Sequence, residues 1–117
     1  MGTSDRRDVD NLRVRSAAAP DGGVVLRLAG ELDLSTVSMF VDALDELLDG
    51  DAGPIEVDMS ELSFIDSSGV GAYVTAYRRA QAKGTRLWVG ERSGLVQRVL
   101  ELSGVEEALA REATENT

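Results

Sequence analysis

Residues 62–73 read Leu-Ser-Phe-Ile-Asp-Ser-Ser-Gly-Val-Gly-Ala-Tyr, and the fold predicted for the whole chain depends on this stretch. An apolar run stops here at one acidic residue and two serines. After these polar residues, apolar side chains recur three, four and seven positions after Val70, at Tyr73, Val74 and Tyr77, which is the spacing of the buried face of a helix. The spacing places Asp66-Ser67-Ser68 at the N-terminus of a helix, where backbone N–H groups lack partners within the helix. A serine there, beside a carboxylate, can cap the helix, act as a nucleophile, or accept a phosphate and hold it.

Four other segments have the pattern of β-strands. Large apolar residues stand at every second position in 12–15, 24–29 and 55–59, which is typical of strands with one covered face. Residues 87–89 are a short apolar run that indicates a buried strand. Because the turn sequence Pro20-Asp-Gly-Gly23 joins the first two segments, they are predicted to pair as a hairpin.

Three helices are expected, each between a capping residue and a glycine or polar stop. The first is expected to run from Ser35 to Gly50, the second from Ser67 or Ser68 to about Lys83, and the third from Ser93 to Gly104. The residues after Gly104 leave two interpretations open, which are a helical turn around Glu106–Leu109 and a last edge strand.

This order of elements predicts an α/β fold with a mixed sheet of four to five strands, in which an N-terminal hairpin is followed by alternating helices and strands. The expected domain covers residues 11–112, and no structure is expected for a lead at 1–10 or a tail at 113–117. Loops after the carboxyl ends of parallel strands gather at one edge of such a sheet, where ligands and partners bind. The loops expected at 30–35 and 60–68 both lie there, so Asp33 and the Asp66-Ser67 pair are expected to share one surface.

The composition excludes several functions. With 21 Asp and Glu against 12 Lys and Arg, the net charge of −9 repels nucleic acids and anionic membranes, so neither is expected as a partner. The chain has no cysteine for disulfides, thiolate catalysis or thiolate metal sites, and no histidine to serve as a general base. Its apolar runs are far shorter than a membrane span and its N-terminus is polar, so a cytoplasmic protein is expected.

The motifs of the enzyme classes that could use these serines are incomplete. A serine hydrolase usually needs a Gly-x-Ser-x-Gly turn, and no glycine precedes the serines at that spacing. Gly69-x-Gly71 is followed by Val74 where a dinucleotide-binding motif needs a third glycine. A phosphoaspartate receiver domain fits the length and the aspartate after the third strand. It needs a lysine near its last strand, however, and the only lysine is Lys83, at the end of the second helix.

On residue types alone, Ser67 and Ser68 are most simply helix caps, and Asp33 is most simply a loop or capping carboxylate. Gly69 and Gly71 indicate a role beyond capping, because two glycines in the first turn of a helix each destabilise it by about 1 kcal/mol relative to alanine. Their presence favours a need for close access to that backbone. Packing of the helix against the sheet is the alternative explanation.

Two segments together resemble the STAS domain of anti-sigma-factor antagonists, namely Gly30-Glu-Leu-Asp33 and Asp58-Met-Ser-Glu-Leu-Ser-Phe-Ile-Asp-Ser-Ser-Gly-Val-Gly71. The resemblance extends over the hairpin, the three capped helices and the segment 99–104. It implies a bacterial protein that binds an anti-sigma factor and so releases a sigma factor. It further implies a regulated binding module rather than an enzyme, with no catalytic residue, metal or cofactor of its own.

The resemblance also implies roles for individual residues. Ser67 directly follows the aspartate of the motif and would be phosphorylated by the anti-sigma factor acting as an ATP-dependent serine kinase, with a protein phosphatase to reset it. Asp33 would contact the partner, and the expected partner-binding set is Asp33, Asp66, Ser67, Ser68 and Gly69. A structural role in a stress-sensing scaffold or a lipid-transport complex stays open, as does the oligomeric state.

Overall fold

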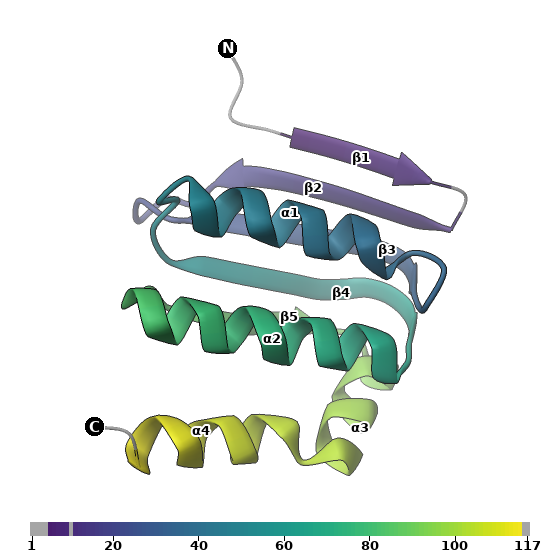
Figure 1. Cartoon of the computed structure of the whole chain (residues 1–117). Helices are drawn as coiled ribbons and strands as arrows, with labels where there is room; N and C mark the ends of the chain where they lie inside the picture. Colours follow the sequence, from purple (N-terminus) through teal and green to yellow (C-terminus); the bar gives the residue numbers. More distant parts are fainter. Residues whose placement is uncertain (1–4, 10, 116–117) are drawn as a thin grey trace.

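A five-stranded mixed sheet is the framework of the protein in the computed structural model, which describes residues 5–9 and 11–115. Its strands lie side by side in chain order (Figure 1): β1 (Asp5–Val9), β2 (Leu12–Ala18), β3 (Val24–Leu32), β4 (Ile55–Ile65) and β5 (Leu87–Arg92). The pairs β1–β2 and β2–β3 are antiparallel, whereas β3–β4 and β4–β5 are parallel. The predicted α/β fold, with a mixed sheet and a hairpin ahead of the parallel strands, is confirmed.

The helices connect the parallel strands and close one side of the sheet. Helices α1 (Val37–Asp49) and α2 (Ser67–Lys83) lie side by side over one face of the sheet (Figure 1), and each is the crossover between two parallel strands. After β5 come α3 (Gly94–Ser103) and α4 (Val105–Glu115). An ion pair from α2 to α4 joins Arg78 Nη2 to Glu112 Oε2 at 2.8 Å.

Both chain ends carry secondary structure that the sequence analysis did not expect. Residues 5–9 form β1, which pairs with the outer edge of β2 through backbone groups and so needs no alternation of apolar side chains. At the other end, the helical interpretation is right and the edge strand is wrong, because a helix carries the buried Leu109 into the core. The expected unstructured tail is therefore helical over 113–115. Residues 1–4, 10 and 116–117 lie outside the described part of the chain.

The core between the sheet and the helices consists mainly of aliphatic side chains. In β2, Leu12 and Val14 are buried while Arg13 and Arg15 are exposed, which confirms the period-2 pattern of this strand. The largest side chains with less than 2% exposure are Phe40, Leu12, Leu26, Leu28, Leu32, Leu44, Leu48, Ile55, Met59, Leu62, Val14 and Val57. They come from β2, β3, β4 and α1, so α1 is held firmly against the sheet.

Strand β4 is longer than expected, and this shortens the loop that carries the candidate site. The alternation of apolar residues predicted that this strand ends at Met59 and is followed by a loop over 60–68, but β4 continues to Ile65. Its register shifts against both neighbouring strands, so the strict alternation that identifies a strand is broken in this part. Only Asp66 separates β4 from α2, so the serines sit directly on the framework of the sheet.

A buried carboxylate links the middle of β3 to β4. Asp58 is 8% exposed and accepts hydrogen bonds from the backbone N–H and hydroxyl of Ser60, at 2.9 and 2.7 Å, and from Arg27 Nε at 3.2 Å. Burial by itself raises the pKa of Asp58, but the Ser60 and Arg27 hydrogen bonds outweigh it and leave the pKa below its ordinary value. The folded protein therefore favours the ionised form of this side chain.

We expect Asp58 to stabilise the fold at neutral pH and to lose that effect in acid. Because its folded pKa lies below its unfolded pKa, the contribution is complete above about pH 4 and disappears as the pH falls through the folded pKa. Replacement by asparagine, Asp58→Asn, should lower the free energy of unfolding at pH 7 by about 1 kcal/mol. Urea unfolding of both proteins at several pH values checks this. A difference that stays constant or grows towards pH 3 would contradict it.

Candidate functional site

The carboxyl ends of β3 and β4 bring the two predicted acidic segments together. The backbone N–H of Asp66 donates to the carbonyl oxygen of Leu32 at 3.2 Å, so Asp66 and Asp33 follow directly from adjacent, hydrogen-bonded strand ends. In Figure 1 the β3–α1 and β4–α2 connections lie next to one another at the same end of the sheet. The expectation that Asp33 and the Asp66-Ser67 pair share one edge is confirmed.

The cap of α2 is Asp66, not a serine as residue types alone suggested. Asp66 Oδ1 accepts the backbone N–H groups of Ser68 at 2.9 Å and Gly69 at 3.3 Å. A carboxylate suits this position because it also interacts favourably with the positive end of the helix dipole. Ser67 is thereby released from capping and is the exposed first residue of α2, whereas Ser68 is half-buried.

Asp33 organises the β3–α1 loop through its own carboxylate. Its Oδ1 accepts the hydroxyl of Ser35 at 2.7 Å, the N–H of Ser35 at 2.9 Å and the N–H of Thr36 at 3.2 Å. The hydroxyl of Ser35, followed by these backbone groups, holds the pKa of Asp33 below its ordinary value. The expected cap Ser35 is wrong, because the N-cap is Thr36 and its hydroxyl donates to the carbonyl oxygen of Glu31 at 2.9 Å.

The two glycines of α2 have different surroundings. A Cβ on Gly69 would lie 2.8 Å from Cγ and Cδ2 of Leu32 and 3.0 Å from Cγ1 of Ile65, so a bare backbone is needed for α2 to approach the sheet. A Cβ on Gly71 would meet nothing within 4 Å. Packing therefore explains Gly69, which is buried below the surface, and does not explain Gly71.

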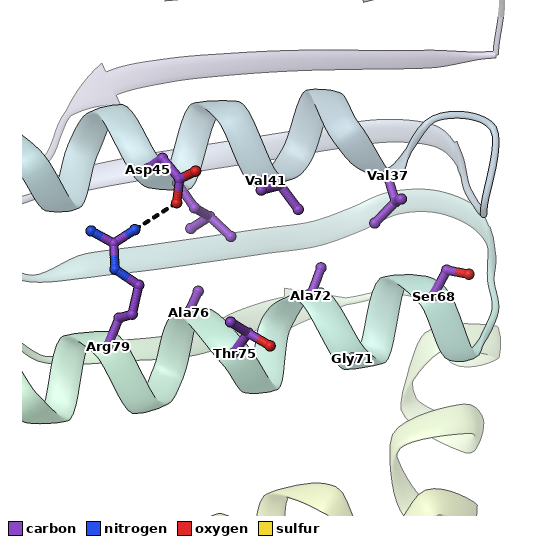
Figure 2. Close-up of a pocket in the computed structure, with 10 residues that line it drawn as sticks. Val37, Val41, Asp45, Ser68, Gly71, Ala72, Thr75, Ala76 and Arg79 are labelled. Atoms are coloured by element: carbon purple, nitrogen blue, oxygen red, sulfur yellow. Dashed lines mark hydrogen bonds and ion pairs between the residues drawn. The ribbon is translucent and has the colours of Figure 1, made fainter.

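A groove that was not predicted from the sequence opens beside these residues, between α1 and α2. Its volume is about 260 Å³, and Figure 2 shows Val37 and Ser68 at one end and Arg79 with Asp45 at the other. Arg79 closes that end by ion pairs to Asp45 at 2.5 Å and Asp49 at 2.8 Å. The walls between are mainly aliphatic, from Val37, Val41, Leu44, Ala72 and Ala76. Small residues at the α2 positions facing α1 were the signal for this groove.

The part of the chain that the structure describes, residues 5–9 and 11–115, offers neither a membrane span nor a metal site. No helix in this part of the chain is long and apolar enough to cross a membrane. The same residues contain no group of three or more acidic side chains placed to hold a metal ion. The features that remain at the edge are the exposed Ser67 hydroxyl, the two hydrogen-bonded carboxylates Asp33 and Asp66, and the neighbouring groove.

This combination of fold and edge matches a known family. A family model described as "Mlab, STAS domain" matches residues 8–111, so the chain belongs to the STAS-domain family. The anti-sigma F factor antagonist of Paenibacillus polymyxa is 33% identical over 85 residues, which cover 72% of this chain and 73% of that protein. The anti-sigma-B factor antagonist of Listeria monocytogenes is 26% identical over 82 residues, covering 70% of this chain and 72% of that protein.

Solved structures agree with this assignment. The anti-sigma factor antagonist SpoIIAA in its unphosphorylated form superposes with a TM-score of 0.65 at 27% identity, over 92% of this chain and 94% of that one. The phosphorylated form of Bacillus SpoIIAA gives a TM-score of 0.59 at the same identity, over 92% and 97%. An anti-sigma factor antagonist from Mycobacterium paratuberculosis has a TM-score of 0.69 at 22% identity, over 91% and 80%, and supports the fold alone.

Proposed function

We propose that this STAS domain is an anti-sigma-factor antagonist, whose unphosphorylated form binds an anti-sigma factor and so releases a sigma factor. The observation that carries the proposal is the exposed hydroxyl of Ser67, directly after the capping Asp66 and beside the Asp33 loop. Similarity to anti-sigma factor antagonists, one of them solved with and without phosphate, supports it. Such a regulator works in the cytoplasm, where sigma factors meet RNA polymerase.

In this proposal, phosphorylation of Ser67 is the off switch. A phosphate adds a charge of about −1.5 to −2 and three oxygen atoms at an edge that already carries Asp33 and Asp66. The N–H groups of Ser68 and Gly69 already donate to Asp66, so they do not neutralise the phosphate. Its charge and volume therefore face the approaching partner, and the expected contact residues Asp33, Asp66, Ser67 and Ser68 lie around it.

The protein itself is a substrate and a binding partner in this scheme, and not an enzyme. The chain has no histidine or cysteine to activate the serine, so the kinase would supply ATP, Mg²⁺ and the catalytic base. The anti-sigma factor is the proposed serine kinase, and a separate protein phosphatase would restore the free hydroxyl. The buried Gly69 contributes to binding only indirectly, by seating α2 on the sheet.

The first experiment identifies the kinase and maps the phosphate. Fractions of a lysate from the source organism are assayed for ATP-dependent phosphorylation of the purified protein, and the active protein is identified, expressed and purified. We expect the phosphate on Ser67, because its hydroxyl is exposed whereas Ser68 is half-buried beside the groove. Phosphopeptide mapping of wild type, Ser67→Ala and Ser68→Ala decides this. Label that persists in Ser67→Ala and disappears in Ser68→Ala would contradict the assignment.

A second candidate function is that of a structural STAS subunit in a scaffold or a lipid-transport complex. The match of residues 8–111 to a STAS-domain model fits this function as well, because the resemblance to STAS domains leaves a structural role open. A structural subunit needs no modification at Ser67. Phosphorylation in the assay above would therefore support the antagonist, and a protein that co-purifies with partners but is never phosphorylated would support the structural subunit.

A further inference from the structure

Two large hydrophobic side chains are exposed at the edge that carries Ser67. Leu34 lies in the β3–α1 loop between Asp33 and Ser35, and it is 78% exposed. Phe64 is the penultimate residue of β4, opposite Glu31 of β3, and it is 43% exposed. A single exposed leucine is common on protein surfaces and needs no explanation. Two such side chains at the ends of adjacent strands, both within three residues of Asp33 or Ser67, add exposed apolar surface to the candidate site, and they are called the apolar patch below.

Leu34 is held out in solvent by a rigid loop. On its C-terminal side, the N–H groups of Thr36 and Val37 donate to the carbonyl oxygen of Asp33 at 3.1 and 2.8 Å. On its N-terminal side, the N–H of Asp33 donates to the hydroxyl of Thr36 at 3.0 Å, and the carboxylate of Asp33 accepts from Ser35. A loop whose backbone is already ordered loses little conformational entropy when a partner covers it. The loop thus presents Leu34 in the way expected of a binding residue.

The surroundings of this patch indicate the chemistry of its partner. The groove begins three residues after Leu34, at Val37, and Ser68 lies in its opposite wall, so apolar surface continues past Ser67 between α1 and α2 (Figure 2). Glu31, which is exposed, and the carboxylates of Asp33 and Asp66 border the patch with negative charge. A partner that covers this edge must offer an apolar centre surrounded by basic side chains.

We propose that Leu34 and Phe64 form the apolar centre of the surface on which the anti-sigma factor docks, and that this factor presents a complementary apolar patch with a basic rim. The inference rests on the proposed function and adds to it the residues that supply the affinity. It also explains the position of the switch, because a phosphate on Ser67 would stand at the margin of a surface that must lose its water on binding.

The test measures affinity for the purified kinase by titration calorimetry. Leu34→Ser and Phe64→Thr should each weaken binding about tenfold, and the double variant more than either alone. Glu31→Lys should also weaken binding, because it would repel the basic rim. The matched control is Leu102→Ser, because Leu102 is also 78% exposed but lies at the far end of α3, next to the turn into α4 (Figure 1). It should bind like wild type, and circular dichroism verifies that all variants are folded.

The possible outcomes separate this inference from the proposed function. Wild type that binds the kinase while folded Leu34→Ser and Phe64→Thr bind equally well would overturn the inference and leave the proposed function standing. Loss of binding in Leu102→Ser to the same extent would also overturn it. If the wild type is a dimer that Leu34→Ser converts to a monomer without changing kinase affinity, the patch belongs to a contact between two copies and the inference is wrong. Wild type that binds no kinase overturns the proposed function, and the inference falls with it.

Discussion

Phosphorylation of Ser67 is expected to weaken binding of the anti-sigma factor about a hundredfold, and Ser67→Asp about tenfold. These losses correspond to about 2.7 and 1.4 kcal/mol. The phosphate adds bulk and a strongly hydrated charge at the edge that carries Leu34 and Phe64, and it must lose its water when the partner covers this apolar surface. The aspartate carries one charge and less volume than the phosphate, so it should reproduce only part of the effect. Titration calorimetry with the purified kinase measures all three forms.

A control on the same helix separates a local effect from a change in overall charge. Gln81→Glu also adds one negative charge, at an exposed position 14 residues along α2 from Ser67. That spacing is about 21 Å along the helix axis, beyond the distance at which salt screens surface charges. Gln81→Glu should therefore bind the anti-sigma factor like wild type. Ser67→Ala should also bind, and incubation with the kinase and ATP should not switch it off. Equal affinities for wild type, Ser67→Asp and the phosphoprotein would contradict the switch and favour the structural subunit.

The location of the site could be predicted because it follows from the sheet and not from side-chain detail. Alternating apolar residues identified β2, β3 and the first half of β4, and the helices between parallel strands required crossovers in one direction. The ends of β3 and β4 then had to meet at one edge, which put Asp33 beside Asp66 before any contact was known. The order of strands and helices depends on the apolar pattern of many residues together, so one residue that departs from the pattern does not change the predicted topology.

The local hydrogen bonds could not be predicted, because several residue types compete for the same role. Asp66, Ser67 and Ser68 are all good helix caps, and only the geometry shows that Asp66 takes the two N–H groups and leaves Ser67 exposed. Likewise, Thr36 takes the N-cap position of α1 that was expected for Ser35, and the carboxylate of Asp33 accepts the N–H groups of both. The second half of β4 was missed because its register shifts hide the alternation, and β1 was missed because it pairs by its backbone.

The two glycines of α2 should respond to the same substitution with opposite signs. Gly69→Ala is expected to destabilise the fold by about 1–3 kcal/mol, because the new methyl group would overlap the buried Leu32 and Ile65 and force α2 away from the sheet. Gly71→Ala is expected to stabilise it by up to about 1 kcal/mol, since the methyl group meets no neighbour and alanine favours the helix. Both residues lie in the same helix and undergo the same change, so each is the control for the other.

Urea unfolding at neutral pH measures both free energies, and the pair also tests why α2 begins with these glycines. If the close approach of Gly69 to Leu32 sets the position of the α2 N-terminus, Gly69→Ala should also slow phosphorylation of Ser67, because the hydroxyl moves with the helix. Gly71→Ala should leave the contact between Gly69 and Leu32, and with it the rate of phosphorylation, unchanged. A Gly69→Ala protein as stable as wild type would show that Leu32 and Ile65 can give way, and the packing explanation for this glycine would then be wrong.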